Sequence, residues 1–315
     1  MRIFQSLSEK ISLALAKEAR YLVANPDVYE AVKIGDFSTG REHYLSHGKS
    51  EGRKYAVNIE WSQRPSQFIE STSRVAFASE IMASTQGHIL EIGPLNLPIV
   101  AGPRCQYFDI VPTSQLKIKA IAAGLNPDTV PDINYFHPTG DLSVVPLKFD
   151  AVVSAHCIEH QPDLIQHLIQ VSALLNKGGK YFLVIPDQRY CFDHFLPPSR
   201  IKEVIEAHLE KRKMPSEQSI IEHHVFVTHN DPVRHWNGDH GSGTENVLKK
   251  WESAVELVSK SKGEYVDVHC WQFQPKAFED LITNLSNLGH ISFKINKVFS
   301  TAKNNLEFFA VLEKQ

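Results

Sequence analysis

Three acidic side chains stand where predicted strands end, which is where open α/β sheets bind their ligands. Glu91 lies at the end of an apolar strand, Asp109 closes the next apolar run, and Asp141 follows Gly140. Carboxylates accept hydrogen bonds from hydroxyl, amine and ammonium groups, so the pattern predicts a small ligand rich in such donors. Three structural alternatives stay open: a salt bridge for Glu91, a solvent-exposed strand end for Asp109, and a turn in which Asp141 binds its own backbone.

The turn after Glu91 carries one glycine and two prolines. Dinucleotide sites use the pattern G-x-G-x-x-G, in which the glycines and the start of the next helix hold a pyrophosphate. Only Gly93 fits that spacing here. Pro94 has no N–H to offer an anion, and Pro98 shortens any helix that follows. The turn therefore predicts a nucleotide site for a cationic ligand and not for a diphosphate.

Histidine is the second source of chemistry, with sixteen in the chain. His156 follows a buried strand at the same predicted edge of the sheet, and a base there would take the proton of an attacking hydroxyl group. His194 and His269 belong to a later polar segment. We expect these three histidines to be catalytic, although an ordinary structural role stays open for each. His160 would share a helical face with His156 if the next helix began early.

A polar segment over 192–270 is rich in imidazoles and carboxylates that could bind a divalent cation. Its spacing matches no tight metal motif, H-E-x-x-H is absent, and the run 222–226 is equally typical of an ordinary helix or strand face. We therefore assign no metal ligand. A polar acceptor pocket under an inserted lid is the simpler interpretation, with Trp236 and Trp271 stacking on a sugar ring.

Alternating strand and helix patterns position these residues. From residue 61 onward the pattern predicts a doubly wound, mostly parallel sheet with helices on both faces. The predicted helices cover 66–84, 162–175 and 275–288, and the segment 192–270 interrupts the alternation as an insertion. The predicted strands cover 88–92, 104–111, 148–154, 180–186, 291–298 and 306–312, the last of them antiparallel.

Residues 1–60 differ from the rest and predict a separate helical module, which leaves 61–315 as the main domain. An apolar stripe at helical spacing opens the chain, and it packs on the neighbouring domain or lies on a membrane surface. Asn25 is expected to cap a helix that begins at Pro26. The stretch 21–53 resembles a short module of bacterial proteins of cell-surface polysaccharide assembly. The stripe consists of Ile3, Leu7, Ile11 and Leu15.

Five short motifs in order resemble class I S-adenosylmethionine-dependent methyltransferases. The resemblance covers about residue 85 to the C-terminus and implies a seven-stranded sheet, the fold of that family, with the insertion between its fifth and sixth strands. A narrower similarity, through 185–194 and 267–275, is to bacterial methyltransferases associated with surface-glycan synthesis. The motifs are Leu90-Glu-Ile-Gly93, Phe108-Asp109, Gly140-Asp-Leu142, the stretch 149–163 and Lys177-Gly-Gly179.

The resemblance implies S-adenosylmethionine as the cofactor and a role for each matching residue. Asp109 would accept the two ribose hydroxyls, Asp141 the adenine amine, and Leu142 would pack on the adenine ring. Glu91 would bind the methionine ammonium or position the turn, and Gly93 would let the backbone approach. Pro94, Ile110 and His156 complete the expected cofactor-binding set.

The expected activity is transfer of a methyl group to a sugar hydroxyl in bacterial glycan synthesis. Two departures from the family pattern keep alternatives open: the run 94–98 replaces a glycine-rich loop, and Leu196 stands where an arginine is usual. The alternatives are an NAD-dependent oxidoreductase on a Rossmann-like sheet and a non-catalytic, methyltransferase-like scaffold. The missing second and third glycines argue against the oxidoreductase.

Charge and composition limit the kinds of molecule that the protein is expected to bind. A formal net charge of −3 gives no basic surface for nucleic acid, and no apolar run is long enough to span a membrane. Four widely spaced cysteines predict free thiols. We expect a cytoplasmic protein that acts on a small-molecule or glycan acceptor, and peripheral membrane or glycan-assembly association and homo-oligomerisation stay open.

Overall fold

The computed structural model describes residues 21, 25–53, 68–69, 71–242, 246–261 and 263–315. The chain divides into two compact units, Met1–Arg64 and Pro65–Gln315. The predicted division between residues 60 and 61 lies outside the described residues, so its exact place stays a prediction. The stripe of Ile3 to Leu15 lies outside them too.

The described part of the first unit is helical. It contains α2 (Pro26–Ile34), α3 (Gly40–His43) and a π-helical turn over Tyr44–Gly48. Asn25 occupies the N-cap position of α2, but its side chain does not cap the helix. Its amide nitrogen donates to Tyr21 O and its oxygen accepts from Arg53 Nη1, and Arg53 also pairs with Asp27 in the first turn.

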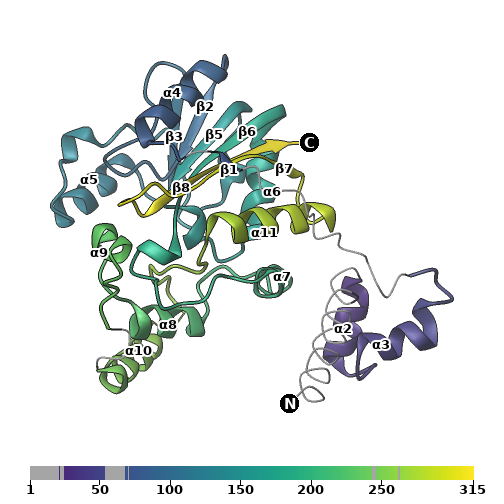
Figure 1. The fold of residues 1–315 in the computed structure, drawn as a ribbon. Coiled ribbons are helices and arrows are strands. Elements are labelled where there is room, and N and C mark those ends of the chain that lie inside the picture. Colours follow the sequence, from purple (N-terminus) through teal and green to yellow (C-terminus); the bar gives the residue numbers. More distant parts are fainter. Residues whose placement is uncertain (1–20, 22–24, 54–67, 70, 243–245, 262) are drawn as a thin grey trace. The chain divides into compact units, whose positions relative to one another are not determined.

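The second unit is built on one sheet with the strand order β1-β7-β8-β6-β5-β2-β3-β4 (Figure 1). Every strand is parallel to its neighbours except β8, which runs antiparallel to β6 and β7. The strands are β1 (Phe68–Ile69), β2 (Ile89–Ile92), β3 (Cys105–Asp109), β4 (Tyr135–Phe136), β5 (Phe149–Ala155), β6 (Leu175–Pro186), β7 (Phe293–Phe299) and β8 (Glu307–Lys314).

This topology confirms the predicted fold class, a doubly wound, mostly parallel α/β sheet with an antiparallel last strand. The sheet has eight strands among the described residues where seven were expected, because the short strand β1 adds to its edge beside β7. From β2 the chain moves outward to β3 and β4, and it then returns to place β5 on the other side of β2. The carboxyl ends of β2 and β5 therefore flank a topological switch point, where open sheets of this kind bind ligands.

The predicted helix over 66–84 is wrong in its first half. Phe68 and Ile69 form β1 and pair with β7, and α4 begins only at Arg74 and ends at Ser84. Ser73 sets that start, because its side chain accepts a hydrogen bond from the backbone amide of Ala76 and so caps the helix.

Apolar residues cover both faces of the sheet, because successive side chains of a strand point to opposite sides. On one face, Phe77 and Ile81 of α4 pack against residues of β2, β5, β6 and β8. On the other face, Phe278 of α11 (Pro275–Asn287) contacts Phe308 of β8, and α6 (Leu164–Leu174) covers β6. Burying each of these large side chains contributes roughly 1.5–3 kcal/mol.

Two further helical parts complete the unit. The helix α5 (Thr113–Ala122) follows β3 and buries Leu116 and Ala120 against Val130. The described residues of the insertion between β6 and α11 include four α-helices, and Figure 1 shows three of them, α8, α9 and α10, grouped below the sheet. They are α7 (Ile201–Leu209), α8 (Glu217–Phe226), α9 (Pro232–Trp236) and α10 (Val247–Ser261).

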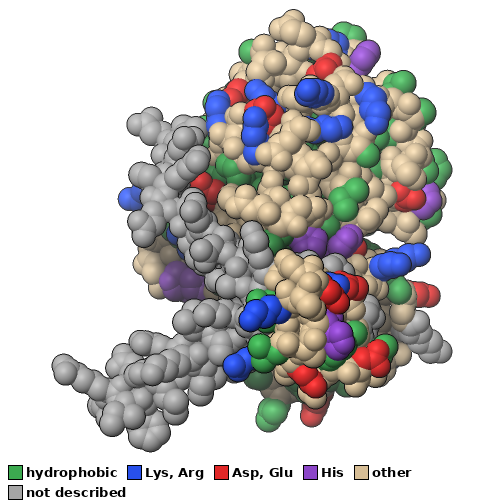
Figure 2. Space-filling model, turned by 90° about the vertical axis from the view of Figure 1, so that its right-hand side faces the viewer, with side chains coloured by type: hydrophobic (Ala, Val, Ile, Leu, Met, Phe, Trp, Pro, Cys, Tyr) green, Lys and Arg blue, Asp and Glu red, His purple; other side chains and the backbone are tan. Residues whose placement is uncertain are grey.

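The surface carries charges of both signs close together. Figure 2 shows Lys and Arg side chains beside Asp and Glu side chains over the face it presents. On β7, Lys294 pairs with Glu313 at 2.9 Å, and Lys297 pairs with Glu80. All four cysteines are free thiols, as the sequence predicts. Within the described residues, no helix is both long and apolar enough to cross a membrane.

Candidate active site

The switch point begins at Gly93, directly after β2. Its φ of 69° lies in the left-handed region, and its amide donates to Phe108 O of the neighbouring strand. A Cβ at this position would meet only Cys157 Cβ, at 4.0 Å, so the backbone stays approachable. Residues 93–104 form no helix, whereas a dinucleotide site needs a helix N-terminus here. Pro94 is buried at the start of this loop.

Glu91 holds the loop of residues 93–104, which contains no helix. Its two carboxylate oxygens accept hydrogen bonds from the backbone amides of Ile99 at 2.8 Å and Val100 at 3.1 Å. Burial raises the pKa of Glu91 to about 7, although both amides and the charge of Arg74 lower it. Of the predicted roles, the structure therefore favours positioning of the turn.

Asp109 ends β3 at the same edge and is buried. Its Oδ1 accepts from the amides of Ile110 at 2.7 Å and Val111 at 3.3 Å, which fixes the turn after the strand. Burial raises the pKa of Asp109, and these two amides act in the opposite direction. Ile110 is exposed, and its Cγ2 lies 3.9 Å from where a Cβ of Gly140 would stand. The turns that carry Asp109 and Asp141 are thus neighbours.

Asp141 adopts the turn geometry that the sequence left open. Its Oδ1 accepts from the Ser143 amide at 3.0 Å and from Gln170 Nε2 at 2.6 Å, and it caps a 3-10 turn over Leu142–Val144. The hydrogen bonds from Ser143 lower the pKa of Asp141. Leu142 is 1% exposed, so its side chain belongs to the core and does not form an open platform for an adenine ring.

His156 follows β5 on the other side of the switch point. Its φ of 49° is strained for a residue with a side chain, which is common at functional sites. The ring Nε2 lies 2.6 Å from Glu307 Oε1 at the start of β8. Glu307 also binds Arg74 of α4 through both oxygens. Burial alone raises the pKa of Glu307, but hydrogen bonds from His156 and Arg74 bring it to about 2.

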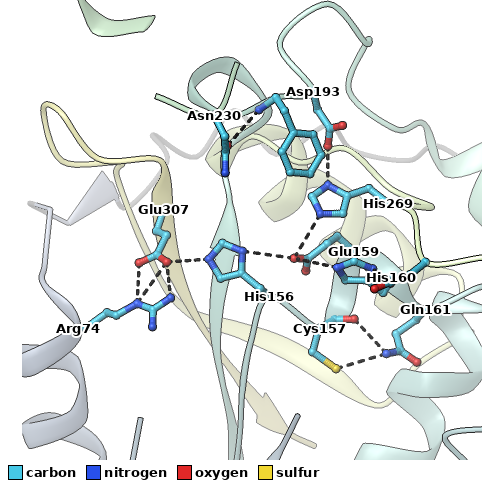
Figure 3. A network of polar contacts seen from close by, with 12 residues as sticks. Arg74, His156, Cys157, Glu159, His160, Gln161, Asp193, Asn230, His269 and Glu307 are labelled. Carbon is cyan, nitrogen blue, oxygen red and sulfur yellow. Dashed lines mark hydrogen bonds and ion pairs between the residues drawn. The ribbon is translucent and has the colours of Figure 1, made fainter. Parts of the chain in front are cut away.

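The same loop brings further imidazoles around the buried carboxylate of Glu159 (Figure 3). His160 directly follows Glu159 in the chain and His269 comes from the end of the insertion, and their Nε2 atoms each lie 3.9 Å from Glu159 Oε1. His156 Nδ1 lies 3.6 Å from the same oxygen. On its other side, His269 Nδ1 is bound to buried Asp193 Oδ2 at 2.6 Å. We call Glu159, His160 and His269 the Glu159 cluster.

The predicted helical pairing of His156 with His160 is wrong. The helix α6 begins at Leu164, where Asp163 caps it by accepting from the Gln166 amide, and residues 158–160 form a 3-10 turn instead. The two imidazoles meet at Glu159 through this turn. Of the three histidines predicted to be catalytic, His156 and His269 come together at Glu159.

His194 belongs to a different group. Its Nδ1 lies 2.7 Å from Arg189 O, and its ring stacks on His240 at 3.7 Å between centroids with an angle of 9°. The ring of His235 lies 5.1 Å away on the same stack, and its Nδ1 is 3.1 Å from His240 Nδ1. We call these three residues the His194 stack.

Other contacts already engage the two tryptophans that were expected to stack on a sugar. Trp271 is 4% exposed and donates to Gln161 O at 2.6 Å, so only a small part of its ring faces the neighbouring polar cavity. Trp236 stacks on Tyr190 at 4.1 Å and donates to Asn305 O, which uses one face of its ring to hold α9.

A polar cavity of about 380 Å³ lies between the insertion and the start of α6. It reaches His269 and Trp271 on one side, and α7 and α8 line another part of it. Polar and charged side chains that line it are Arg200, Glu203, Glu206, Arg212, Gln218 and Glu222. A cavity with so many hydrogen-bonding groups suits a hydroxyl-rich molecule.

Sequence reasoning missed Arg74 and Glu307, which orient His156. They lie far from it along the chain, and only tertiary folding joins α4, β5 and β8 at this point. One signal was present: Glu307 is a lone acidic residue at the start of a strongly apolar strand, where a buried charge needs a partner.

No protein-family model and no curated protein matches the chain. Solved structures with a similar fold include an S-adenosylmethionine-dependent methyltransferase from Clostridium acetobutylicum, with 10% identity over 77% of this chain and 92% of that chain, at a TM-score of 0.39. The CcbJ methyltransferase from Streptomyces caelestis shows 12% identity over 77% and 95%, at 0.38. The N-methyltransferase NodS from Bradyrhizobium japonicum shows 11% over 76% and 93%, at 0.32. Because these scores are low, the functional proposal rests on the sheet order and the site geometry.

Proposed function

We propose that this chain is an S-adenosylmethionine-dependent methyltransferase that methylates a hydroxyl group of a sugar in bacterial glycan synthesis. The observation that carries the proposal is the pair of features at the switch point. An approachable glycine turn without a following helix ends β2, and an imidazole held by a buried carboxylate ends β5. The glycine turn suits a cationic nucleoside, and the imidazole suits removal of a proton from an alcohol.

The residues at the carboxyl edge of the sheet suit the groups that S-adenosylmethionine presents. When bound, it supplies an electrophilic methyl group on a sulfonium. Asp109 would accept the ribose hydroxyls, because a carboxylate can accept from both groups of a vicinal diol. Gly93 would let the backbone lie against the donor, and the turn of Asp141 would border its adenine. Glu91 holds the loop of residues 93–104 in place.

His156 is suited to act as the general base. Because its Nε2 faces the Glu307 carboxylate, the proton of the neutral ring resides there and Nδ1 keeps its lone pair. Glu307 would also stabilise the imidazolium that forms when Nδ1 takes a proton. A positioned base contributes roughly 10²- to 10⁴-fold to such a step. His269, bound to Asp193, would orient the acceptor beside it.

The polar cavity supports a sugar as acceptor, since its wall offers charged and amide side chains for several hydroxyl groups. It reaches His269, which ties it to the Glu159 cluster and to His156. A nicotinamide cofactor is less compatible with the site, because residues 93–104 provide no helix N-terminus for a pyrophosphate. The proposed setting is the cytoplasm, with a glycan precursor as the acceptor.

Calorimetric titration with S-adenosylhomocysteine tests donor binding. The wild type should bind it, and Asp109→Ala should abolish detectable binding. Asp128→Ala is the matched control, because Asp128 is exposed on a separate turn. If the wild type failed to bind at millimolar ligand, the enzymatic proposal would be wrong.

Transfer of a labelled methyl group to a panel of sugars and nucleotide sugars tests the base. His156→Ala should lower kcat by about 10²-fold or more while donor affinity is kept. His88→Ala is the control, because His88 is exposed at the opposite end of β2. Equal turnover of wild type and His156→Ala would exclude His156 as the base.

A further inference from the structure

The carboxylate of Glu159 is buried without a hydrogen bond. The residue is 0% exposed, and neither oxygen has a hydrogen-bond partner among the described residues. A buried ionised carboxylate is costly unless it is paired or binds a metal. Glu159 lies in a 3-10 turn whose backbone is fixed, since Glu159 O accepts the amides of Cys270 and Trp271. These backbone hydrogen bonds therefore fix the position from which the Glu159 side chain extends.

Imidazole nitrogens surround one oxygen of this carboxylate. The Nε2 atoms of His160 and His269 lie 3.9 Å from Glu159 Oε1, beyond hydrogen-bond reach. One ligand atom from each of the three residues lies within 4.8 Å of the others. The two rings stand at 90° to each other, with centroids 4.7 Å apart. Ligands about 2.0–2.2 Å from a tetrahedral ion lie about 3.4 Å apart, so the two contacts to Glu159 would each have to shorten by about 0.5 Å to hold an ion.

Carboxylates on the far side of each ring orient the free nitrogens inward. His269 Nδ1 is hydrogen-bonded to Asp193 Oδ2 at 2.6 Å. His160 Nδ1 lies 3.0 Å from Asp267 Oδ1, an ion-pair contact without hydrogen-bond geometry. These contacts favour a proton on Nδ1 and a lone pair on Nε2. Two lone pairs then face a carboxylate oxygen with nothing positive between them. Histidines that bind metals are held by carboxylates in this way.

The geometry points to a divalent transition-metal site in which Glu159, His160 and His269 are the ligands. Two imidazoles and one carboxylate suit Zn²⁺ or Fe²⁺ better than Mg²⁺, which prefers oxygen ligands. Three protein ligands leave at least one coordination position open, as in catalytic and not structural sites. His156 Nδ1, 3.6 Å from Glu159 Oε1, borders the site from the side of the switch point.

The His194 stack is an internal comparison for this site. The rings of His194 and His240 are nearly parallel, so their lone pairs lie in parallel planes and do not point to a common centre. Ligand atoms of these three residues also lie within 4.8 Å of one another, but all three rings are stacked, and His194 and His235 already contact backbone carbonyls.

Titration of tag-free, chelator-treated protein with Zn²⁺ tests the inference, with equilibrium dialysis and metal analysis as the readout. The wild type should bind one equivalent, and Co²⁺ in the same site should give visible absorption bands from an N/O ligand set. Mg²⁺ should not compete. A wild type that binds no Zn²⁺ would overturn the proposal.

Variants locate the site. Glu159→Gln and His269→Gln should each weaken Zn²⁺ binding at least 100-fold, and Asp193→Asn should weaken it about 10- to 100-fold through the orientation of His269. His235→Gln, in the His194 stack, should leave affinity and stoichiometry unchanged. Loss of Zn²⁺ in His235→Gln with retention in Glu159→Gln would overturn the assignment.

Circular dichroism separates misfolding from ligand loss, and His160→Gln serves as a second ligand variant because its partly exposed side chain tolerates replacement best. If it folds and binds Zn²⁺ as tightly as the wild type, His160 is not a ligand. The inference does not depend on the proposed methyl transfer, because Zn²⁺ affinity is measured without donor or acceptor.

Discussion

Buried carboxylates on the two sides of the switch point are satisfied in different ways. On the β2 side, Glu91 and Asp109 each accept two backbone amides from their own loops. On the β5 side, Glu159 is as deeply buried and faces imidazoles from two segments without a hydrogen bond. Both sides place carboxyl groups at one edge of the sheet, but only the carboxyl groups on the β2 side bind the backbone of their own loops.

The difference teaches what each side is built to do. A carboxylate bound by loop amides makes a rigid, preformed surface, which suits a cofactor that must sit in one orientation. A buried carboxylate without such bonds carries an electrostatic cost that an external cation removes. Burial of Glu91 therefore stabilises a loop, whereas burial of Glu159 leaves a carboxylate that a cation could pair with. Substituting each residue and measuring the free energy of unfolding distinguishes the two roles.

The largest expected effect is on stability at Glu91. Glu91→Ala leaves the part-buried amide of Ile99 and the buried amide of Val100 without acceptors, which should cost on the order of 4 kcal/mol in the free energy of unfolding. Glu159→Gln in cation-free protein breaks no hydrogen bond and should cost less than about 1 kcal/mol. Urea unfolding with matched m-values measures both.

The isosteric Glu91→Gln controls for the loss of volume, because it keeps one of the two amide acceptors and should fall between the other variants. If Glu159→Gln cost as much as Glu91→Ala, the comparison would fail, and Glu159 would have to be a paired structural residue.

The sequence predicted the strands of this site and the residues at their ends. It did not predict the contacts between distant segments that complete the site. Apolar runs and turn residues predicted six strands, and they placed Gly93, Asp109 and His156 at one edge, because the carboxyl ends of parallel strands share an edge. Local chemistry also offered the turn at Asp141 as an alternative to ligand contact, and the structure has this turn, in which a short acidic side chain follows Gly140 and binds the nearby backbone.

Contacts between distant segments were beyond sequence reasoning. The Glu307 carboxylate reaches His156 across 151 positions, and Asp193 reaches His269 across 76. No spacing rule predicts such pairs, since they depend on how the insertion folds back on the sheet. Local capping also overrode periodicity at Ser73 and Asp163, which moved the starts of α4 and α6.

A smaller effect contrasts Glu91 with His167, which is buried behind β6 against Tyr181. Burial raises the pKa of Glu91 to about 7 and lowers the pKa of His167 to about 4. The native state therefore holds an extra proton on Glu91 between about pH 4.5 and 7, so this residue's contribution to stability falls as pH rises. The native state lacks a proton on His167 between about pH 4 and 6.5, so that contribution falls as pH drops. Each is worth roughly 3 kcal/mol at most.

Unfolding free energies between pH 4 and 7.5 test this pair. Relative to the wild type, Glu91→Gln should gain stability as pH rises, and His167→Gln should gain it as pH falls. Slopes of the same sign in both difference curves would contradict the assignment of either residue as a buried neutral group.

The smallest expected effect concerns Asp141, which lies on the proposed cofactor-binding side of the switch point, as Glu91 does, but is more exposed than Glu91. Serine also caps helices, so Asp141→Ser should change the unfolding free energy by less than about 1 kcal/mol. Its short side chain cannot replace a carboxylate that accepts an adenine amine, and the affinity for S-adenosylhomocysteine should fall about 5- to 10-fold. Asp141→Asn keeps both the cap and an acceptor oxygen and should bind like the wild type. If Asp141→Ser also bound like the wild type, Asp141 would act only on its own turn, and the donor side would hold adenine without it.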